Sequence, residues 1–154
     1  MTQRQTTINT TALRILARRD HAEAELAQKL SRRGFADDAI RALLRQLTQQ
    51  DLLNDQRFAE SYLRARRNKG YGPNRITLEL QARGITAEMI AEIVEITDNA
   101  WLIEIDKVWR KRFKSELPQN QQQRAKQARF LQYRGFTLEQ IRHFYDKTKH
   151  HTQH

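Results

Sequence analysis

The amino-acid sequence predicts an all-α protein of three tandem three-helix, helix-turn-helix-like repeats that form an elongated, curved array. Three observations predict this fold class. A Leu-x-x-Arg-Gly motif occurs three times at nearly constant spacing, apolar residues follow each copy in the same phase, and no segment alternates with the period of a β-strand. Because each repeat of such an array contacts only its neighbours, an elongated and curved shape is expected.

The repeated motif predicts how one helix of each repeat ends. Its copies are Leu30-x-x-Arg33-Gly34-Phe35, Leu80-x-x-Arg83-Gly84-Ile85 and Leu131-x-x-Arg134-Gly135-Phe136. Helices often end at a glycine in the left-handed conformation, where a Cβ atom would clash, and the next residue then packs back on the last helical turn. Each motif therefore predicts a helix end, with the residue after glycine packed on the leucine.

The first repeat is expected at residues 6–50. Leu13 and Leu16 predict a helix that ends near Arg19, and Asp20-x-x-Glu23 predicts the N-terminal cap of the second helix. The third helix follows the first glycine turn.

The second repeat is expected at residues 54–97. Asn54 or Asp55 starts its first helix, and Pro73 fits the first turn of the next helix, after the break Gly70-Tyr71-Gly72. Thr86 can cap the third helix.

The third repeat is expected at residues 98–148, followed by a flexible tail at 149–154. A helical stripe that includes Trp101 and Trp109 predicts a core helix, so both indoles are expected inside. The run Gln121 to Gln123 begins the next helix, and Thr137-x-x-Gln140 predicts a capping box.

The net charge indicates a polyanionic partner, most often a nucleic acid. The chain has 28 Lys and Arg against 18 Asp and Glu, a formal charge of +10, and a pI near 10.4. Residues 1–53, 54–97 and 98–154 carry +3, +1 and +6, so the C-terminal repeat holds most of the excess. The alternative is a well-solvated basic surface with no binding role.

Two basic stretches supply the candidate nucleic-acid-binding residues. They are Arg64, Arg66, Arg67, Lys69, Tyr71, Arg75, Lys107, Arg110, Lys111, Arg112, Lys114, Arg124, Lys126, Arg129 and Arg134. Cations near helix C-termini also offset the helix dipole, which is a structural alternative for each of them. Tyr71 either stacks on a base or covers the neighbouring helix ends. Charge reversal of Arg66 with Lys69 is expected to leave the thermal midpoint nearly unchanged, as for exposed charges.

Several function classes are excluded or disfavoured by the sequence. The chain has no cysteine, which excludes disulfides and thiolate sites. It has no catalytic or phosphate-loop motif, and His21 and His143 have no evident catalytic partner, so no enzyme activity, cofactor or metal is expected. The tail histidines His150, His151 and His154 are not expected to form a metal site. No apolar run reaches membrane-spanning length, and a cytoplasmic location is expected.

The middle of the chain resembles the RecX family of RecA regulators. The residues that carry the likeness are Leu53 to Ala59, Arg64, Lys69 to Ile76, Glu79-Leu80 and Arg83 to Ile85, with Phe130 to Phe136 in the third repeat. The resemblance covers residues 11–147, nearly the whole chain.

The resemblance implies a helical regulator that binds the RecA–DNA filament in its helical groove. It implies inhibition of filament growth, strand exchange and coprotease activity, in DNA recombination, repair and the SOS response. Some members of the family also bind DNA directly, and the dispersed cations of this sequence predict weak binding of single- or double-stranded DNA without sequence preference. No dimerisation segment is apparent in the sequence, so a monomer is expected. The alternatives are a stand-alone helix-turn-helix DNA-binding protein, which needs a base-reading helix and usually a dimer, and a protein adaptor whose basic face meets an acidic partner.

Overall fold

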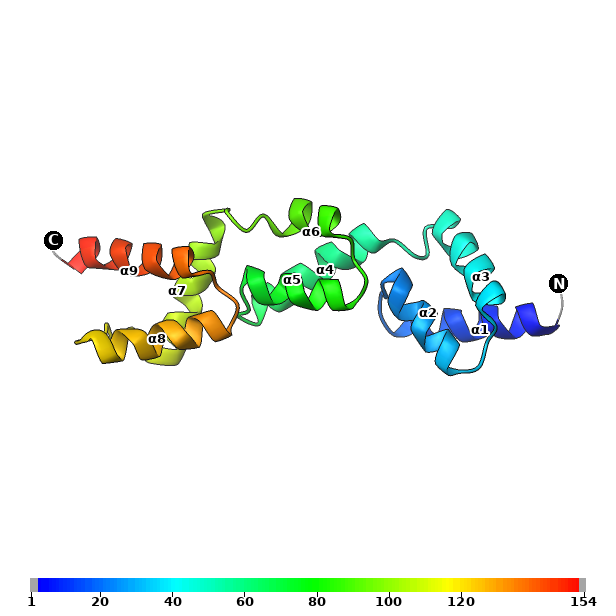
Figure 1. The fold of residues 1–154 in the computed structure, drawn as a ribbon, viewed down its shortest axis with the longest axis horizontal. Helices are drawn as coiled ribbons and strands as arrows, with labels where there is room; N and C mark the ends of the chain where they lie inside the picture. The colour runs from blue at the N-terminus through cyan, green and yellow to red at the C-terminus, as the bar shows by residue number, and fades with distance from the viewer. Residues whose placement is uncertain (1–2, 153–154) are drawn as a thin grey trace. The chain divides into compact units, whose positions relative to one another are not determined.

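The computed structural model describes residues 3–152 of the chain, all of them in helices or in the turns between helices (Figure 1). The helices are α1 (Gln3–Arg18), α2 (Glu23–Arg32), α3 (Asp37–Gln49), α4 (Asp55–Asn68), α5 (Pro73–Ala82), α6 (Ala87–Val94), α7 (Ala100–Phe113), α8 (Gln121–Tyr133) and α9 (Leu138–Thr152). No strand occurs within residues 3–152, which confirms the predicted all-α class.

The backbone of α9 is helical to Thr152, beyond the end of the third repeat that the sequence predicts at residue 148. Residues 153–154 and the side chains of residues 150–152, the tail histidines among them, lie outside the described part of the chain.

The helices group into two compact units. Unit 1 combines Met1–Ser61 with Leu80–Ile90, and unit 2 combines Tyr62–Glu79 with Ala91–His154. The middle repeat therefore contributes to both units. The repeat boundaries at 6–50, 54–97 and 98–148 stay a prediction, since the units describe packing and do not delimit repeats.

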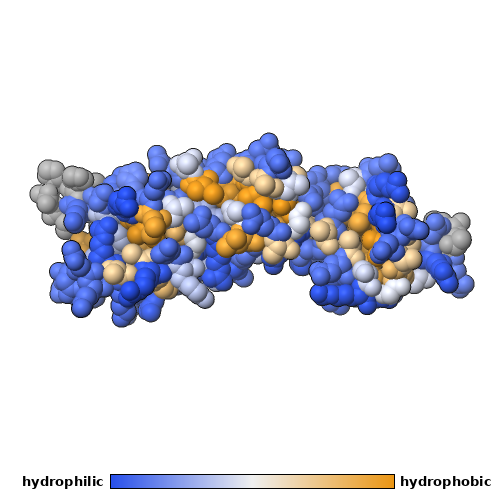
Figure 2. Space-filling model, viewed as in Figure 1, coloured by the Kyte–Doolittle hydropathy of each residue, from blue (hydrophilic) through white to orange (hydrophobic). Residues whose placement is uncertain are grey.

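The core of unit 1 lies among α1, α2 and α3. Its buried residues are Ile8, Ala12, Ile15, Leu26, Leu30, Ile40, Leu43, Leu44, Leu47 and Leu53. Ile8, Ala12 and Ile15 follow the helical spacing along one face of α1, which is why that face packs inward. Figure 2 shows that apolar side chains on the visible face gather in separate patches between polar ones, as expected for a chain that is only 38% hydrophobic.

The core of unit 2 is built around the apolar stripe of α7. Trp101 and Trp109 are 2% and 3% exposed, which confirms that they are core residues. Phe136 packs edge-on against Trp101, and Phe144 packs edge-on against Trp109. These pairs join α7 to the turn after α8 and to α9.

Gln127 on α8 is a buried polar residue in this core. Its Oε1 atom accepts hydrogen bonds from Trp109 Nε1 at 2.9 Å and from the Tyr145 hydroxyl at 2.8 Å. Its Nε2 atom donates to the carbonyl oxygen of Glu116 at 3.0 Å. Burial raises the pKa of Tyr145 to about 12, against the opposing charge of Arg124. The sequence pattern does not predict this network.

The predicted glycine turns are confirmed. Gly34, Gly84 and Gly135 have φ angles of +90°, +84° and +104°. The amide of the residue after each glycine donates to the carbonyl of the motif leucine, at 3.3, 3.1 and 3.2 Å respectively. Gly70 ends α4 in the same way, with Tyr71 N donating to Arg66 O at 3.1 Å. The Leu-x-x-Arg-Gly motif does not include this fourth turn, because Arg66 takes the place of the leucine and Lys69 that of the arginine.

Most predicted caps are confirmed. Asn54 Oδ1 accepts from Arg57 N at 3.0 Å, and Pro73 is the first residue of α5. Thr137 and Gln140 form the capping box, with bonds of 2.9 and 3.0 Å. Thr86 accepts from the amide of Met89 at 3.2 Å.

The predicted cap of α2 by Asp20 is wrong. The N-cap residue is Ala22, and the Glu25 side chain reaches back to accept from Ala22 N at 3.1 Å. Asp20 instead lies 3.7 Å from the guanidinium of Arg57. Glu25 satisfies the helix start because it stands three residues after the cap, the spacing that a capping carboxylate needs.

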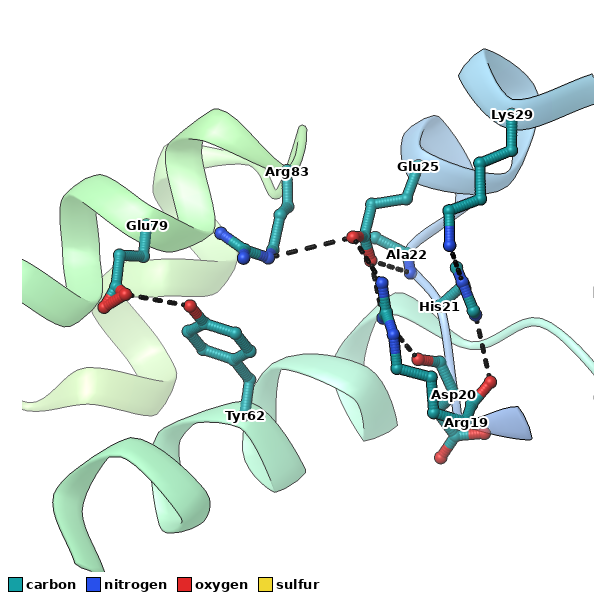
Figure 3. A network of polar contacts seen from close by, with 9 residues as sticks. All are labelled: Arg19, Asp20, His21, Ala22, Glu25, Lys29, Tyr62, Glu79 and Arg83. Carbon is teal, nitrogen blue, oxygen red and sulfur yellow. Dashed lines mark hydrogen bonds and ion pairs between the residues drawn. The ribbon is translucent and has the colours of Figure 1, made fainter. Parts of the chain in front are cut away.

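A buried histidine links α1 to α2 (Figure 3). His21 is 3% exposed, its Nδ1 atom lies 3.0 Å from the carbonyl oxygen of Arg19, and Lys29 Nζ lies 2.7 Å from its Nε2 atom. A carbonyl only accepts, so Nδ1 carries the proton and Nε2 accepts from the lysine. Burial lowers the pKa of His21, and the charges of Arg19 and Lys29 lower it further.

Substitution of two glycines separates backbone strain from packing. A Cβ on Gly34 meets nothing within 4 Å, whereas one on Gly84 lies 2.5 Å from the Cβ of Ala24. Gly34→Ala should lower the free energy of unfolding by about 1 kcal/mol through the left-handed conformation alone. Gly84→Ala should cost at least about 1 kcal/mol more, because α2 must move. Urea unfolding followed by circular dichroism measures both, and equal losses would contradict the packing role of Gly84.

Acidification should destabilise the protein through His21. The histidine pKa is about 6.5 in the unfolded chain and lower in the folded one, so stability is lost as the pH falls below about 6.5. From about pH 7.5 to about pH 5.5 the thermal midpoint of His21→Asn should fall less than that of the wild type. His143→Asn, at an exposed position on α9, is the control and should keep the wild-type dependence. A His21→Asn variant with an unchanged pH dependence would rule out this linkage.

Candidate nucleic-acid interface

The C-terminal end of α4, helix α7 and the C-terminal end of α8 enclose a basic hollow in unit 2. It has a volume of about 310 Å³ and is lined by Arg67, Asn68, Lys69, Gly70, Glu104, Lys107, Val108, Lys111, Arg112, Phe130 and Arg134. We call it the unit 2 hollow. Six predicted binding residues, drawn from both basic stretches of the sequence, therefore share one surface.

A direct backbone contact brings the two stretches together. Gly72 N donates to Arg134 O, and Asn74 N donates to Gly135 O, both at 2.8 Å. A Cβ on Gly72 would lie 2.5 Å from the carbonyl carbon of Gly135, so the turns can approach this closely only without a side chain there. Arg134 Nη1 also donates to Lys69 O at 3.2 Å. These bonds hold the turn after α4 and the turn after α8 together, and both turns contribute residues to the hollow lining.

The ring of Tyr71 is surrounded by guanidinium groups. Those of Arg66, Arg75 and Arg134 lie 3.9, 4.5 and 5.1 Å from its centroid. Tyr71 also follows the glycine that ends α4 and is half-buried there. The arrangement favours the second interpretation of Tyr71, a cover for neighbouring helix ends, over a base-stacking platform.

Phe130 holds two cations of the hollow in the same manner. The guanidinium carbons of Arg112 and Arg134 lie 5.3 and 5.2 Å from its centroid. Contact with a ring orients a guanidinium while leaving its N–H groups available to an anion. Phe130 is not among the predicted binding residues, although its position four residues before Arg134 places both on one helical face.

The charge of the unit 2 hollow is weakly compensated. Its lining has six Lys and Arg side chains and one carboxylate, that of Glu104. Glu104 Oε1 lies 3.7 Å from Lys107 Nζ. The remaining positive charge suits phosphate groups or an acidic surface.

Three predicted residues are engaged outside the hollow. Arg66 pairs with Glu79 through two contacts of 3.0 Å, Arg110 Nε donates to Asp106 at 2.7 Å, and the guanidinium of Arg124 lies 4.4 Å from the ring centroid of Tyr145. Burial opposes the charge of Arg66, but the hydrogen bond and charge of Glu79 outweigh it and raise the Arg66 pKa. The premise that Arg66 is an ordinary exposed charge is therefore wrong.

The other predicted residues lie away from the hollow lining. They are Arg64 on α4, Arg75 on α5, Lys114 after α7, and Lys126 and Arg129 on α8. Arg75 also lies over the exposed ring of Tyr133, at 5.5 Å. Their roles in binding stay predictions.

The described helices are each too short or too polar to cross a lipid bilayer. The described helices and the unit 2 hollow together define the class of this chain, which is an all-helical repeat protein with a basic surface suited to polyanions.

Family models for the first, second and third three-helix domains of RecX match residues 10–47, 54–93 and 105–145. The chain belongs to the RecX family.

Curated relatives support this assignment over most of the chain. The Regulatory protein RecX of Pseudomonas entomophila (strain L48) is 40% identical over 134 residues, 87% of this chain and 86% of the relative. The Regulatory protein RecX of Halorhodospira halophila (strain DSM 244 / SL1) is 43% identical over 131 residues, 85% of this chain and 81% of the relative.

A solved structure has the same fold. The crystal structure of RecX from Lactobacillus salivarius matches with a TM-score of 0.82 at 21% sequence identity, covering 96% of this chain and 97% of that one. The three predicted three-helix repeats are thus confirmed.

Charge reversal at Arg66 should destabilise unit 2. The side chains of Arg66 and Glu79 are only 21% and 20% exposed, so Arg66→Glu should cost about 1–3 kcal/mol of unfolding free energy by removing the pair and opposing Glu79. The double variant Arg66→Glu/Glu79→Arg should recover part of the loss. Lys69→Glu, at an exposed position, should stay within about 0.5 kcal/mol of the wild type. Urea denaturation measures all three, and an unchanged Arg66→Glu midpoint would contradict the pairing.

Proposed function

We propose that this protein regulates RecA by binding the RecA–DNA filament in its helical groove, and that it thereby inhibits filament growth, strand exchange and coprotease activity. Family membership supports the proposal, because curated relatives at about 40% identity are named regulatory proteins. The observation that carries it is the unit 2 hollow, where two basic stretches form one surface for a polyanion.

The hollow suits the phosphate backbone better than base edges. Its cations come from three helices, and three of the six are lysines, which act as point charges toward phosphate. A surface of this kind binds DNA weakly and without sequence preference. Such a surface suits a regulator of a protein–DNA filament, because the regulator contacts the filament protein and the DNA together.

The stand-alone helix-turn-helix reader is the second candidate. That function needs several side chains of one helix directed at base edges in the major groove. The guanidinium groups of Arg112 and Arg134 are instead held against Phe130, and those of Arg66 and Arg75 against Tyr71. This arrangement favours the filament regulator. We further propose that it acts as a monomer in the cytoplasm, without catalysis, cofactor or metal.

Charge reversal in the unit 2 hollow should weaken inhibition of RecA. Lys69→Glu/Lys111→Glu converts two attractive charges into repulsive ones at exposed positions. The concentration that halves RecA-driven strand exchange should rise about tenfold or more, equivalent to about 1.4 kcal/mol. All assays use one salt concentration, because screening changes these interactions.

The control reverses two exposed cations of unit 2 that do not line the hollow. Arg142→Glu/Lys147→Glu makes the same change in net charge on α9 and should inhibit nearly as the wild type does. Electron microscopy of RecA–single-stranded DNA filaments then locates the bound protein. Full inhibition by the folded Lys69→Glu/Lys111→Glu variant would show that the hollow is a solvated surface without a binding role.

A further inference from the structure

A second basic hollow lies in unit 1, and none of its lining residues is among the candidate nucleic-acid-binding residues predicted from the sequence. It is formed by the C-terminal half of α1, the turn that follows it and helix α2. Its volume is about 710 Å³, and its lining is Arg14, Ile15, Arg18, Arg19, His21, Lys29, Arg32 and Arg33. We call it the unit 1 hollow. Its cations come from residues 14–19, at the end of α1 and in the turn after it, and from residues 29–33, at the end of α2.

The charge of the unit 1 hollow is less compensated than that of the unit 2 hollow. Five arginines and one lysine line it, and none of its described lining residues is acidic. The carboxylate of Glu25 accepts hydrogen bonds from the Arg19 guanidinium at 3.3 and 3.1 Å and from Ala22 N. These bonds hold the carboxylate at the start of α2. Within residues 3–152, no carboxylate lies within 4.0 Å of the guanidinium groups of Arg14, Arg18, Arg32 or Arg33.

The pKa of Lys29, at the floor of the hollow, reflects burial and the repulsion between these neighbouring positive charges. Lys29 donates to the buried His21, as Figure 3 shows, so its ammonium is held in place beside the arginines. Burial lowers the pKa of Lys29, and the charges of Arg19, Arg18 and Arg33 lower it further, against the carboxylate of Glu25. A bound anion would offset this repulsion, so the site gains from an anionic ligand.

The lining identifies the class of ligand. Protein–protein interfaces have an apolar core, whereas Ile15 is the single aliphatic residue in the described lining. Nucleic-acid interfaces are more polar and much more positively charged. Arginine, which predominates here, binds phosphate oxygens through two parallel N–H groups.

We propose that the unit 1 hollow is a second nucleic-acid site, which binds the phosphate backbone without reading bases. Arg14, Arg18, Arg32 and Arg33 contact phosphates, and Lys29, which donates to the uncharged His21, supplies the positive charge of the floor. The site requires no RecA, so this inference does not rest on the filament proposal.

Neutralising three of the arginines that line the unit 1 hollow tests whether the hollow binds phosphate. Arg14→Gln/Arg18→Gln/Arg32→Gln alters exposed positions that make no ion pair in the described structure. Binding to a fluorescein-labelled oligothymidine is measured by anisotropy, without RecA, from about 50 to about 200 mM KCl. Each lost phosphate contact on single-stranded DNA reduces the slope of log K against log salt by about 0.7, so the slope should fall by about 2.

The matched control removes the same charge from unit 1 outside the hollow. Arg4→Gln/Arg41→Gln/Arg45→Gln lies at exposed positions of α1 and α3, and its slope should fall by less than about 0.5. Substitution of lysine at positions 14, 18 and 32 should keep the wild-type slope, since the charge is retained.

Two results would overturn the proposal. Equal reductions in the hollow variant and its matched control would mean that only net charge matters. An unchanged slope in the hollow variant would mean that no phosphate binds there, and loss of RecA binding in that same variant would then assign the hollow to a protein partner.

Discussion

The backbone contact between the turn at Gly72 and the turn at Gly135 is the constraint on which the rest of unit 2 depends. Its two hydrogen bonds of 2.8 Å replace side-chain packing by a main-chain junction, where even a methyl group would collide. A junction of this kind allows little adjustment, because hydrogen-bond geometry and close packing must both hold. The ends of α4 and α8 therefore meet in one arrangement, and so do the basic side chains they carry.

Like charges can be held together only if other contacts compensate their repulsion. Unit 2 does this with aromatic rings, Tyr71 and Phe130, and with carbonyl oxygens such as that of Lys69. These contacts stabilise guanidinium groups without neutralising them, unlike an ion pair with a carboxylate. The fold thus keeps a basic surface that carboxylates do not neutralise, as the proposed binding of a polyanion requires.

Local features of the fold could be predicted from the sequence, and features that join distant residues could not. The turns at Gly34, Gly84 and Gly135 and the box at Thr137 depend on residues within one helical turn, so spacing alone identifies them. The prediction for the cap of α2 failed because Asp20-x-x-Glu23 fits the local capping rule, whereas the helix starts two residues later, with Glu25 accepting from Ala22 N and Asp20 lying near Arg57.

Both hollows escaped prediction for the same physical reason. The unit 2 hollow depends on a contact between residues 72 and 135, which are far apart in the sequence. Its cations therefore form two separate basic stretches in the sequence and one surface in the folded protein. In unit 1, acidic residues such as Asp37 and Asp38 on α3 reduce the formal charge of residues 1–53 to +3, although they do not line the hollow. Charge counted along a chain averages over faces that the folded protein separates.

The placement of the chromophores gives the two units separate optical signals. Both tryptophans and all four tyrosines of the chain, Trp101, Trp109, Tyr62, Tyr71, Tyr133 and Tyr145, fall in unit 2. Intrinsic fluorescence and the absorbance of these rings therefore report on unit 2 alone, whereas far-ultraviolet dichroism averages over the helices of both units. Comparison of the two signals during denaturation reveals whether the halves of the molecule melt together, with no label or truncation.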